Sequence, residues 1–198
     1  PEVLHQLYEI KKETGLKIGI SASGERQSEI VDYASQIKIK NEPLFESFQV
    51  TYNILETSTH DILERLINTG RLVIIKEALA NGRVFKNDDY THYESLYADL
   101  ERLSKKYKAP IDAIALRFVI DHLQPGIVLS GASNSYQLSE NMKALNIKLD
   151  NKELISLKQH TVNYYHSGFL VSHGILEVQK SLHCLMTKGI LNLFRKIK

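Results

Sequence analysis

Apolar and polar positions along this chain follow two periods, and the two periods alternate as far as residue 160. Short runs that are apolar throughout, or at every second position, predict strands at 16–21, 45–55, 71–79 and 126–133. Apolar residues at helical spacing predict helices at 2–15, 26–37, 59–70, 93–107, 110–123, 135–145 and 151–160. Strands separated by helices are typical of an α/β fold with a parallel sheet.

Polar residues occupy alternate positions in the first two predicted strands. In the second strand the polar positions are Ser47, Gln49, Thr51 and Asn53. In the first strand and directly after it, the non-apolar positions are Gly19, Ser21 and Ser23. A parallel sheet buried on both faces has continuous apolar runs, so one face of this sheet is expected to stay polar. Such side chains near strand ends commonly bind a ligand in barrels, and the alternative is a strand end exposed to water.

Four predicted strands are too few for a closed barrel, which needs about eight. An isolated sheet of this size would have two open edges, which favour aggregation. We therefore expect either an upstream half in the same native chain or the pairing of two such halves, and truncation is the simpler account. The chain begins at Pro1 and its methionines are Met142 and Met186, which indicates that N-terminal residues have been removed.

The composition is that of an ordinary globular protein. Of the 198 residues, 43% are hydrophobic and 24% are charged, which excludes disordered and fibrous classes. The single cysteine, Cys184, excludes an internal disulfide and favours a reducing, cytoplasmic location. No apolar run approaches the roughly 20 residues of a membrane span, and no signal peptide is expected.

The formal net charge of +2 hides an asymmetry between the body of the chain and its tail, residues 163–198. The tail has five lysines and arginines but one acidic residue, Glu177, so the rest of the chain is mildly acidic. The acidic body predicts no nucleic-acid binding.

Five segments in order carry a family resemblance: KIGISASG (17–24), FESFQVTYNIL (45–55), VIIKEALANGRV (73–84), DAIALRFVID (112–121) and IVLSGASNSYQLSEN (127–141). Together they resemble the fifth to eighth βα units of the aldo-keto reductase family, over roughly residues 1–157. The resemblance implies a (β/α)8 barrel of the TIM type, whose C-terminal half, with four parallel strands, is formed by residues 1–162. The tail would be a basic, helical C-terminal extension.

The resemblance also implies that NADP or NAD lies across the carboxyl ends of the strands. Ser21 matches the serine of the fifth strand, and Gln49 matches the glutamine of the sixth; both would hold the nicotinamide carboxamide. A hydroxyl and a side-chain amide complement the donors and acceptor of a carboxamide. The alternative interpretation is that Ser21 is a turn residue and that Gln49 forms structural hydrogen bonds.

The segment after the last strand resembles the part of the family that binds the adenosine end of the cofactor. Gly131, Ala132 and Ser133 would form a turn before a helix N-terminus, where backbone amides favour a phosphate. Further along, the residues that match positions facing the ribose phosphate and the adenine are Gln137, Glu140 and Asn141. The alternative is an ordinary capped helix with Ser133 or Asn134 as its N-cap.

The chain also departs from the family pattern. Ala22 stands where many members have asparagine, and Lys76 stands where the seventh strand often ends in a tyrosine that stacks on the nicotinamide. An ammonium can pair with a phosphate or a substrate carboxylate instead. Gly131 and Gln137 replace basic residues that often select a 2′-phosphate, so the choice between NADP and NAD stays open. If Lys76 is desolvated, a Schiff-base barrel aldolase is a minor alternative.

No catalytic residue is assigned within the chain. The resemblance places the family's Asp, Tyr, Lys and His upstream of Pro1, so this chain alone is expected to catalyse no turnover. His60, His92 and His122 are read as residues of helix caps or helices, and Tyr52 as part of an apolar strand face. The sequence shows no Ser/His/Asp arrangement, HExxH, P-loop or GxGxxG.

Two functions follow. The intact protein is expected to be an NAD(P)H-dependent oxidoreductase acting on small-molecule aldehydes, ketones or sugars, with this portion supplying cofactor contacts. The alternative is a non-catalytic reductase-like binding module that acts through a protein partner or a membrane surface.

The tail bears on the second of these functions. Its apolar residues fall at helical spacing, and they are Met186, Ile190, Leu193, Phe194 and Ile197. Such a helix docks on its own domain or lies on an anionic membrane or a partner. His183 and Cys184 lack the spacing of a structural zinc site, so no metal is expected.

Overall fold

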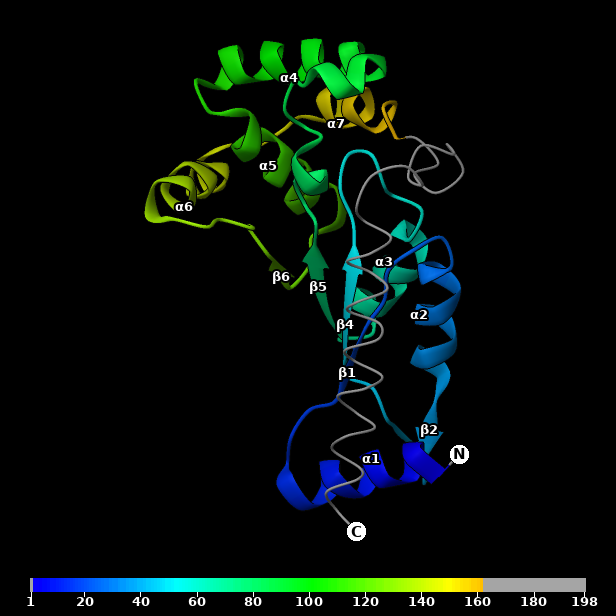
Figure 1. Ribbon diagram of the computed structural model, residues 1–198. Helices are drawn as coiled ribbons and strands as arrows, with labels where there is room; N and C mark the ends of the chain where they lie inside the picture. Colours follow the sequence, from blue (N-terminus) through cyan, green and yellow to red (C-terminus); the bar gives the residue numbers. More distant parts are fainter. Residues whose placement is uncertain (1, 162–198) are drawn as a thin grey trace. The chain divides into compact units, whose positions relative to one another are not determined.

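The computed structural model describes residues 2–161 (Figure 1). The α-helices in this range are α1 (Glu2–Thr14), α2 (Gln27–Gln36), α3 (His60–Asn68), α4 (Glu94–Tyr107), α5 (Ile111–Leu123), α6 (Ser135–Met142) and α7 (Asn151–Lys158). The strands are β1 (Gly19–Ser21), β2 (Lys38–Ile39), β3 (Glu42–Pro43), β4 (Ser47–Thr51), β5 (Leu72–Lys76) and β6 (Ile127–Val128). Short 3-10 helices are η1 (Ala80–Gly82), η2 (Asp88–Tyr93) and η3 (Lys143–Asn146). The predicted tail helix, residues 163–198, lies outside the described residues.

The four expected strands form one sheet in the order β1-β4-β5-β6. All three pairings are parallel, and each crossover contains at least one helix. This confirms the predicted α/β fold with a parallel sheet. The order of strands is the one expected when each helix returns the chain to the start of a neighbouring strand.

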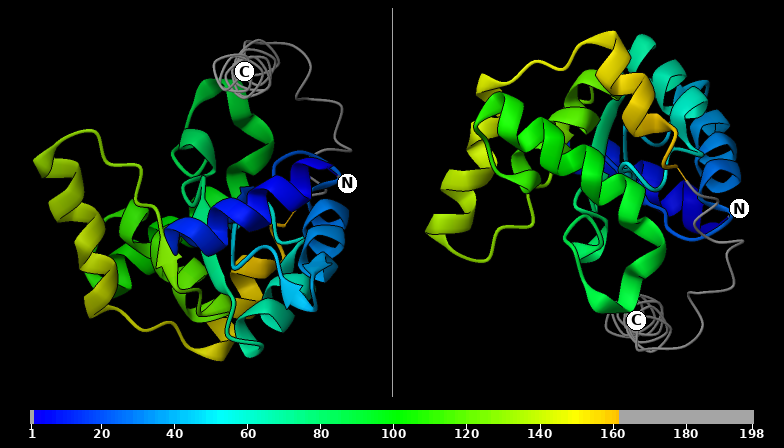
Figure 2. Two further views of the ribbon diagram at one scale, coloured as in Figure 1. Left: turned by 90° about the horizontal axis from the view of Figure 1, so that it is seen from below. Right: turned by 90° about the horizontal axis from the view of Figure 1, so that it is seen from above.

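The sheet has one face covered by helices and a second face on which polar side chains gather at the strand ends. Phe48, Val50, Val73 and Ile75 are fully buried on the side that the helices cover, where α3 packs against β5 and α2 packs against α3 (Figures 1 and 2). Because side chains alternate along a strand, the residues between them lie on the opposite face. The predicted alternation along β4 is therefore confirmed.

Strand register places the polar residues side by side on the second face. Ser21 pairs with Gln49 and Gln49 with Ile74, and Thr51 pairs with Lys76. Register partners in parallel strands point to the same face, so these side chains share it. Apolar residues on this face, towards the edges and the strand starts, are partly exposed: Leu72 (39%), Ile127 (43%) and Leu129 (42%). Within the described residues, this face has no covering layer of helices.

The strands are shorter than the sequence predicts. Beyond Thr51, the backbone closes a turn in which Asn53 and Glu56 exchange N–H···O bonds of 3.0 and 3.1 Å. The side chain of Asn53 also accepts from the amide of Leu55 at 2.9 Å. After β6, Gly131 adopts a left-handed φ of 68° and turns the chain away from the sheet. Local turns therefore end the ladder before the apolar pattern ends.

The β2–β3 hairpin is absent from the sequence prediction. Lys38 and Ile39 pair antiparallel with Pro43 and Glu42, outside the main sheet. Lys40 and Asn41 both take positive φ angles, of 50° and 65°, as a two-residue hairpin turn requires. The segment is too short and too polar for its pattern to indicate a strand.

Phe48→Ala is expected to lower the free energy of unfolding by about 3–5 kcal/mol, because it leaves a cavity under the helical layer. The measurement is urea denaturation of the full chain followed by circular dichroism. The matched control is Ser47→Ala, one residue away on the open face, with an expected change below about 1 kcal/mol. Equal effects of the two substitutions would contradict the assignment of the buried face.

Candidate functional site

Five residues of β1, β4 and β5, and of the turn after β1, form a polar group that we term the strand-end cluster: Ser21, Ser23, Gln49, Thr51 and Lys76. Lys76 ends β5, and its Nζ donates to Ser21 Oγ at 3.2 Å and to Ser23 Oγ. Because β4 lies between β1 and β5, the lysine side chain crosses over β4. The cluster lies at the carboxyl ends of parallel strands, where α/β barrels keep their functional groups.

Gln49 lies beside Ser21 in this cluster. The two are register partners, and the ladder continues one step further through the bond from Ala22 N to Gln49 O, at 2.9 Å. Gln49 is half-buried and Ser21 is exposed. The two side chains predicted to hold a carboxamide are therefore neighbours on the uncovered face of the sheet.

Thr51 adds a polar atom without a partner. Thr51 is fully buried, and its Oγ1 has no hydrogen-bond partner among the described residues. Its backbone is held by Gln27, which donates to Thr51 O and accepts from Thr51 N, both at 3.2 Å. A buried hydroxyl without a partner costs roughly 1–3 kcal/mol, so its place beside Lys76 favours a ligand there.

Lys76 is half-buried, and no carboxylate among residues 2–161 forms an ion pair with it. Burial lowers the pKa of the Lys76 amine, and the neighbouring Glu77 carboxylate acts in the opposite direction. Glu77 itself accepts from Asn81 Nδ2 at 3.1 Å. Desolvation therefore disfavours the charged form of the Lys76 amine, and no carboxylate among the described residues contacts the amine to balance its charge.

The second group of predicted site residues follows β6. Asn134 is the N-cap of α6, because its side chain accepts from Gln137 N at 2.9 Å. The Gln137 side chain folds back and accepts from Ser133 N and Ser133 Oγ, both at 2.8 Å. Glu140 pairs with Lys143 at 2.7 Å. The expected capped helix is therefore present, with Asn134 rather than Ser133 as its cap.

Asn141 has an orphaned acceptor. The residue is 5% exposed, and its Nδ2 donates to Ser130 O at 3.0 Å. Its Oδ1 has no partner among the described residues. A neutral N–H donor, such as the exocyclic amine of a purine, would satisfy this atom.

The structure brings the predicted site residues together in two groups. Ser21, Gln49 and Lys76 meet in the strand-end cluster, whereas Gly131, Ala132, Ser133, Gln137, Glu140 and Asn141 belong to the turn and helix after β6. Because β6 pairs with β5, both groups follow the carboxyl ends of one sheet.

A cluster of the buried Tyr52 and the half-buried His60 and His122 is missing from the sequence prediction. Tyr52 Oη lies 2.8 Å from His60 Nδ1 and 2.5 Å from His122 Nδ1. The hydroxyl has one proton, so one imidazole must accept it while the other donates from its own Nδ1. The phenol of Tyr52 is a polar atom on an apolar strand face, which is the one signal that pointed to such partners.

Burial changes the titration of this cluster. It lowers the pKa of His122 to about 4, and the field of His60 and Lys158 acts in the same direction. Burial also raises the pKa of Tyr52 above its usual range. Phe118 stacks on His122 with ring centroids 5.0 Å apart. Burial therefore favours the neutral forms of His122 and Tyr52, and the cluster joins the end of β4 to α3 and α5.

The structure also corrects the expectation that no Ser/His/Asp arrangement exists. His160 Nε2 lies 2.9 Å from Asp99 Oδ2, and His160 Nδ1 lies 3.4 Å from Ser95 Oγ. Asp99 additionally accepts from Ser156 at 2.7 Å and pairs with Arg102 at 3.1 Å. Asp99 is thus saturated, the serine contact is long, and the group joins α4 to the end of α7. It is a structural clamp.

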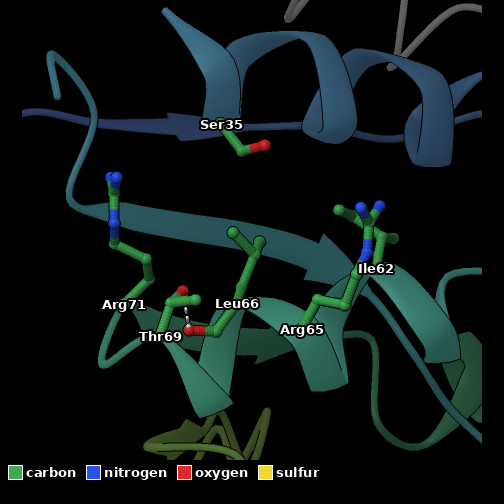
Figure 3. A pocket seen from close by; sticks show the side chains of 6 residues that line it. All are labelled: Ser35, Ile62, Arg65, Leu66, Thr69 and Arg71. Atoms are coloured by element: carbon green, nitrogen blue, oxygen red, sulfur yellow. Dashed lines mark hydrogen bonds between the residues drawn. The ribbon is translucent and has the colours of Figure 1, made fainter. Parts of the chain in front are cut away.

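A hollow of about 240 Å³ lies away from the strand-end cluster (Figure 3). It is lined by Ser35, Ile62, Arg65, Leu66, Thr69 and Arg71. Arg71 directly precedes β5, so this hollow is at the amino end of that strand. Arg65 pairs with Asp32 at 2.7 Å and Arg71 donates to Phe45 O. Both guanidinium groups already have protein partners.

Two further properties concern residues 2–161 alone. In that range no three His, Cys, Asp or Glu side chains are placed to share a metal ion, and no helix has the length and apolarity to cross a membrane.

Comparison with known proteins identifies the family. The sequence profile described as "Aldo/keto reductase family" matches residues 2–162. The chain belongs to the aldo-keto reductase family. The match covers the N-terminal part of this chain and stops where the tail begins. No curated protein matches the chain significantly.

Solved aldo-keto reductases have a similar fold. A thermostable aldo-keto reductase in complex with the inhibitor epalrestat is 25% identical, with a TM-score of 0.56, over 79% of this chain and 53% of that one. The holo form of an aldo-keto reductase from Bacillus halodurans is 19% identical, with a TM-score of 0.58, over 83% and 57%. An aldo-keto reductase from a deep-sea metagenome library of the Medee basin is 14% identical, with a TM-score of 0.58, over 80% and 53%. The chain therefore spans little more than half the length of these reductases.

The half-buried imidazole of His122 predicts a pH dependence of stability. His122 titrates at about 4 in the folded chain and near 6.5 when unfolded, so the unfolded state binds more protons between these values. The free energy of unfolding is therefore expected to fall by about 2 kcal/mol as the pH falls from 7 to 4.5. The measurement is urea denaturation across this pH range.

His122→Asn keeps a polar group near the position of Nδ1 but removes the titration, so its loss of stability over the same range is expected to be smaller. His5→Asn, on the exposed surface of α1, should behave like the unsubstituted chain. If His122→Asn and the unsubstituted chain show parallel pH profiles, the pKa of His122 is not lowered in the fold.

Proposed function

We propose that this chain is the second half of an aldo-keto reductase barrel, corresponding to the fifth to eighth βα units. Three observations support this placement. The five sequence segments occur in the family's order. The sheet has four parallel strands, and one of its faces has no helical layer among residues 2–161. The chain spans 53% to 57% of the length of the reductases above. A barrel needs about eight strands, so a further half would complete it.

The observation that carries the functional proposal is the pairing of Ser21 with Gln49 on the uncovered face. A nicotinamide carboxamide offers two donors and one acceptor. The Gln49 amide can both donate to it and accept from it, and the Ser21 hydroxyl adds one further bond. When bound, the nicotinamide supplies or accepts a hydride. The part of this chain is to position that ring at the ends of β1 and β4.

The group after β6 fits the other end of the cofactor. We propose that Asn141 binds the adenine amine, because its buried Oδ1 has no partner among the described residues. The turn at 131–133 and the N-terminus of α6 offer backbone amides to a phosphate. Gln137 and Glu140 border this surface, although their side chains already bond Ser133 and Lys143. Neither Gly131 nor Gln137 supplies a cation for a 2′-phosphate, so we propose NADP or NAD as cofactor.

We further propose that the intact protein reduces or oxidises small aldehydes, ketones or sugars, as an enzyme of the cytoplasm. The acid–base residues would come from the other half of the barrel, because the strand-end cluster contains no tyrosine or histidine. Tyr52, although close in sequence, is buried on the helical side with His60 and His122. A contact of the tail with a membrane or a protein partner stays a prediction.

In the full-length protein, Gln49→Leu and Asn141→Leu are each expected to weaken NAD(P)H binding by about tenfold. Each change removes hydrogen bonds to the nucleotide, worth about 1–2 kcal/mol. The measurement is titration followed by the fluorescence of the reduced nucleotide. Gln6→Leu, an equivalent change on the exposed surface of α1, is the matched control and should leave the dissociation constant unchanged.

Turnover separates the enzyme from a non-catalytic module. NADPH and NADH oxidation is followed with a panel of aldehydes, ketones and sugars, for the full-length protein and for the 198-residue chain. The full-length protein should turn over and the chain alone should not. Nucleotide binding without turnover by the full-length protein would favour the non-catalytic module. Binding of neither nucleotide would overturn the cofactor proposal.

A further inference from the structure

The amine of Lys76 has surroundings unlike those of lysines that serve as ion-pair partners in this chain. Lys11, Lys106 and Lys143 contact Glu46, Glu153 and Glu140, respectively. Lys76 instead donates to two neutral hydroxyls, those of Ser21 and Ser23. We propose that Lys76 is a nucleophilic amine that captures aldehydes and ketones as a Schiff base. This reaction goes beyond the cofactor proposal and requires no nucleotide.

The position of Lys76 makes the amine both accessible and partly desolvated. It lies at the carboxyl end of β5, the end of the strands at which α/β barrels bind their substrates. A small carbonyl compound can therefore reach it from that end of the sheet. Burial of the stem lowers the pKa of the amine, which enriches the uncharged form that attacks a carbonyl carbon.

The neighbouring hydroxyls suit the steps that follow the attack. The amine nitrogen bonds to the carbonyl carbon, and the oxygen takes a proton to give a carbinolamine. The nitrogen then loses a proton, the hydroxyl leaves as water, and a carbon–nitrogen double bond forms. No oxidant or reductant is involved. Ser21 and Ser23, which already contact Nζ, can transfer these protons.

Thr51 is an independent observation in favour of a ligand. Its register places it next to Lys76 on the same face, and its Oγ1 is fully buried with no partner in the described part of the chain. A carbinolamine hydroxyl close to Nζ could donate to or accept from this atom. The two serine hydroxyls that contact Nζ carry no charge, so they do not neutralise an ammonium group.

An alternative reaction at this cluster exchanges the roles of the lysine and the serine. Lys76 would then be the base, and Ser23 the nucleophile, in acyl transfer. That scheme also needs donors that stabilise an oxyanion beside Ser23. The orphaned Thr51 hydroxyl lies beside Lys76 rather than in such a hole. The Schiff base therefore accounts for more of the cluster.

The test is reductive alkylation of the full 198-residue chain with propanal and cyanoborohydride at neutral pH. Alkylated lysines are mapped by peptide mass spectrometry over time. Lys76 is expected to react several-fold faster than the exposed Lys105, which serves as the internal reference. In 8 M urea (about the concentration that unfolds small domains), the two rates should become equal, because the effect depends on the fold.

Two variants sharpen the result. Ser21→Ala with Ser23→Ala should slow alkylation of Lys76 relative to Lys105, because proton transfer is lost. Thr51→Val keeps the shape of Thr51, removes its hydroxyl, and should slow it as well. The ratio of the alkylation rates of Lys76 and Lys105 is measured in the unsubstituted chain, so the proposal remains testable if these substitutions impair folding.

A ratio near one in the folded chain overturns the proposal. Acylation of Ser23 by p-nitrophenyl acetate, without preferential alkylation of Lys76, would overturn it in favour of the serine nucleophile. Neither result bears on nucleotide binding, which is measured separately, so failure of this inference and failure of the cofactor proposal are distinguishable.

Discussion

The register of β4 between β1 and β5 is the constraint on which the rest of the structure depends. It places Phe48 and Val50 under the helices and leaves Gln49 and Thr51 on the uncovered face. A slip by one residue would exchange the two sets, burying an amide among apolar side chains. The hydrophobic burial of one face therefore determines which groups the other face offers to a ligand. Stability and site geometry have a single origin here.

The parts of the structure that the sequence predicts are those with a local signal. Alternation along β4 predicts its two faces, and the helical spacing of apolar residues predicts the order of the elements. The Tyr52 cluster has no such signal, because Tyr52 and His122 are 70 positions apart and meet only when α5 packs on the sheet. The same holds for Lys76 and Ser21, whose contact crosses β4. The resemblance placed these two residues in one site, whereas the hydrogen bond between them is seen only in the structure.

The buried and open sides of β4 meet at Thr51 and Tyr52, which are consecutive residues. Tyr52 is fixed by His60 of α3 and His122 of α5, and Thr51 by the side chain of Gln27 in α2. Three helices thus hold the carboxyl end of one strand. A site built on such an end keeps its geometry without a ligand, which is what both a carboxamide and a carbonyl compound need. The two histidines contribute by position, through their hydrogen bonds to Tyr52.

The lowered pKa of Lys76 reconciles the two proposals made for the strand-end cluster. The oxidised nicotinamide ring is positively charged, so an ammonium group at the same strand ends would repel it, whereas an uncharged amine would not. A Schiff base also requires the uncharged amine. Burial of Lys76 and the lack of a contacting carboxylate favour that form in both cases.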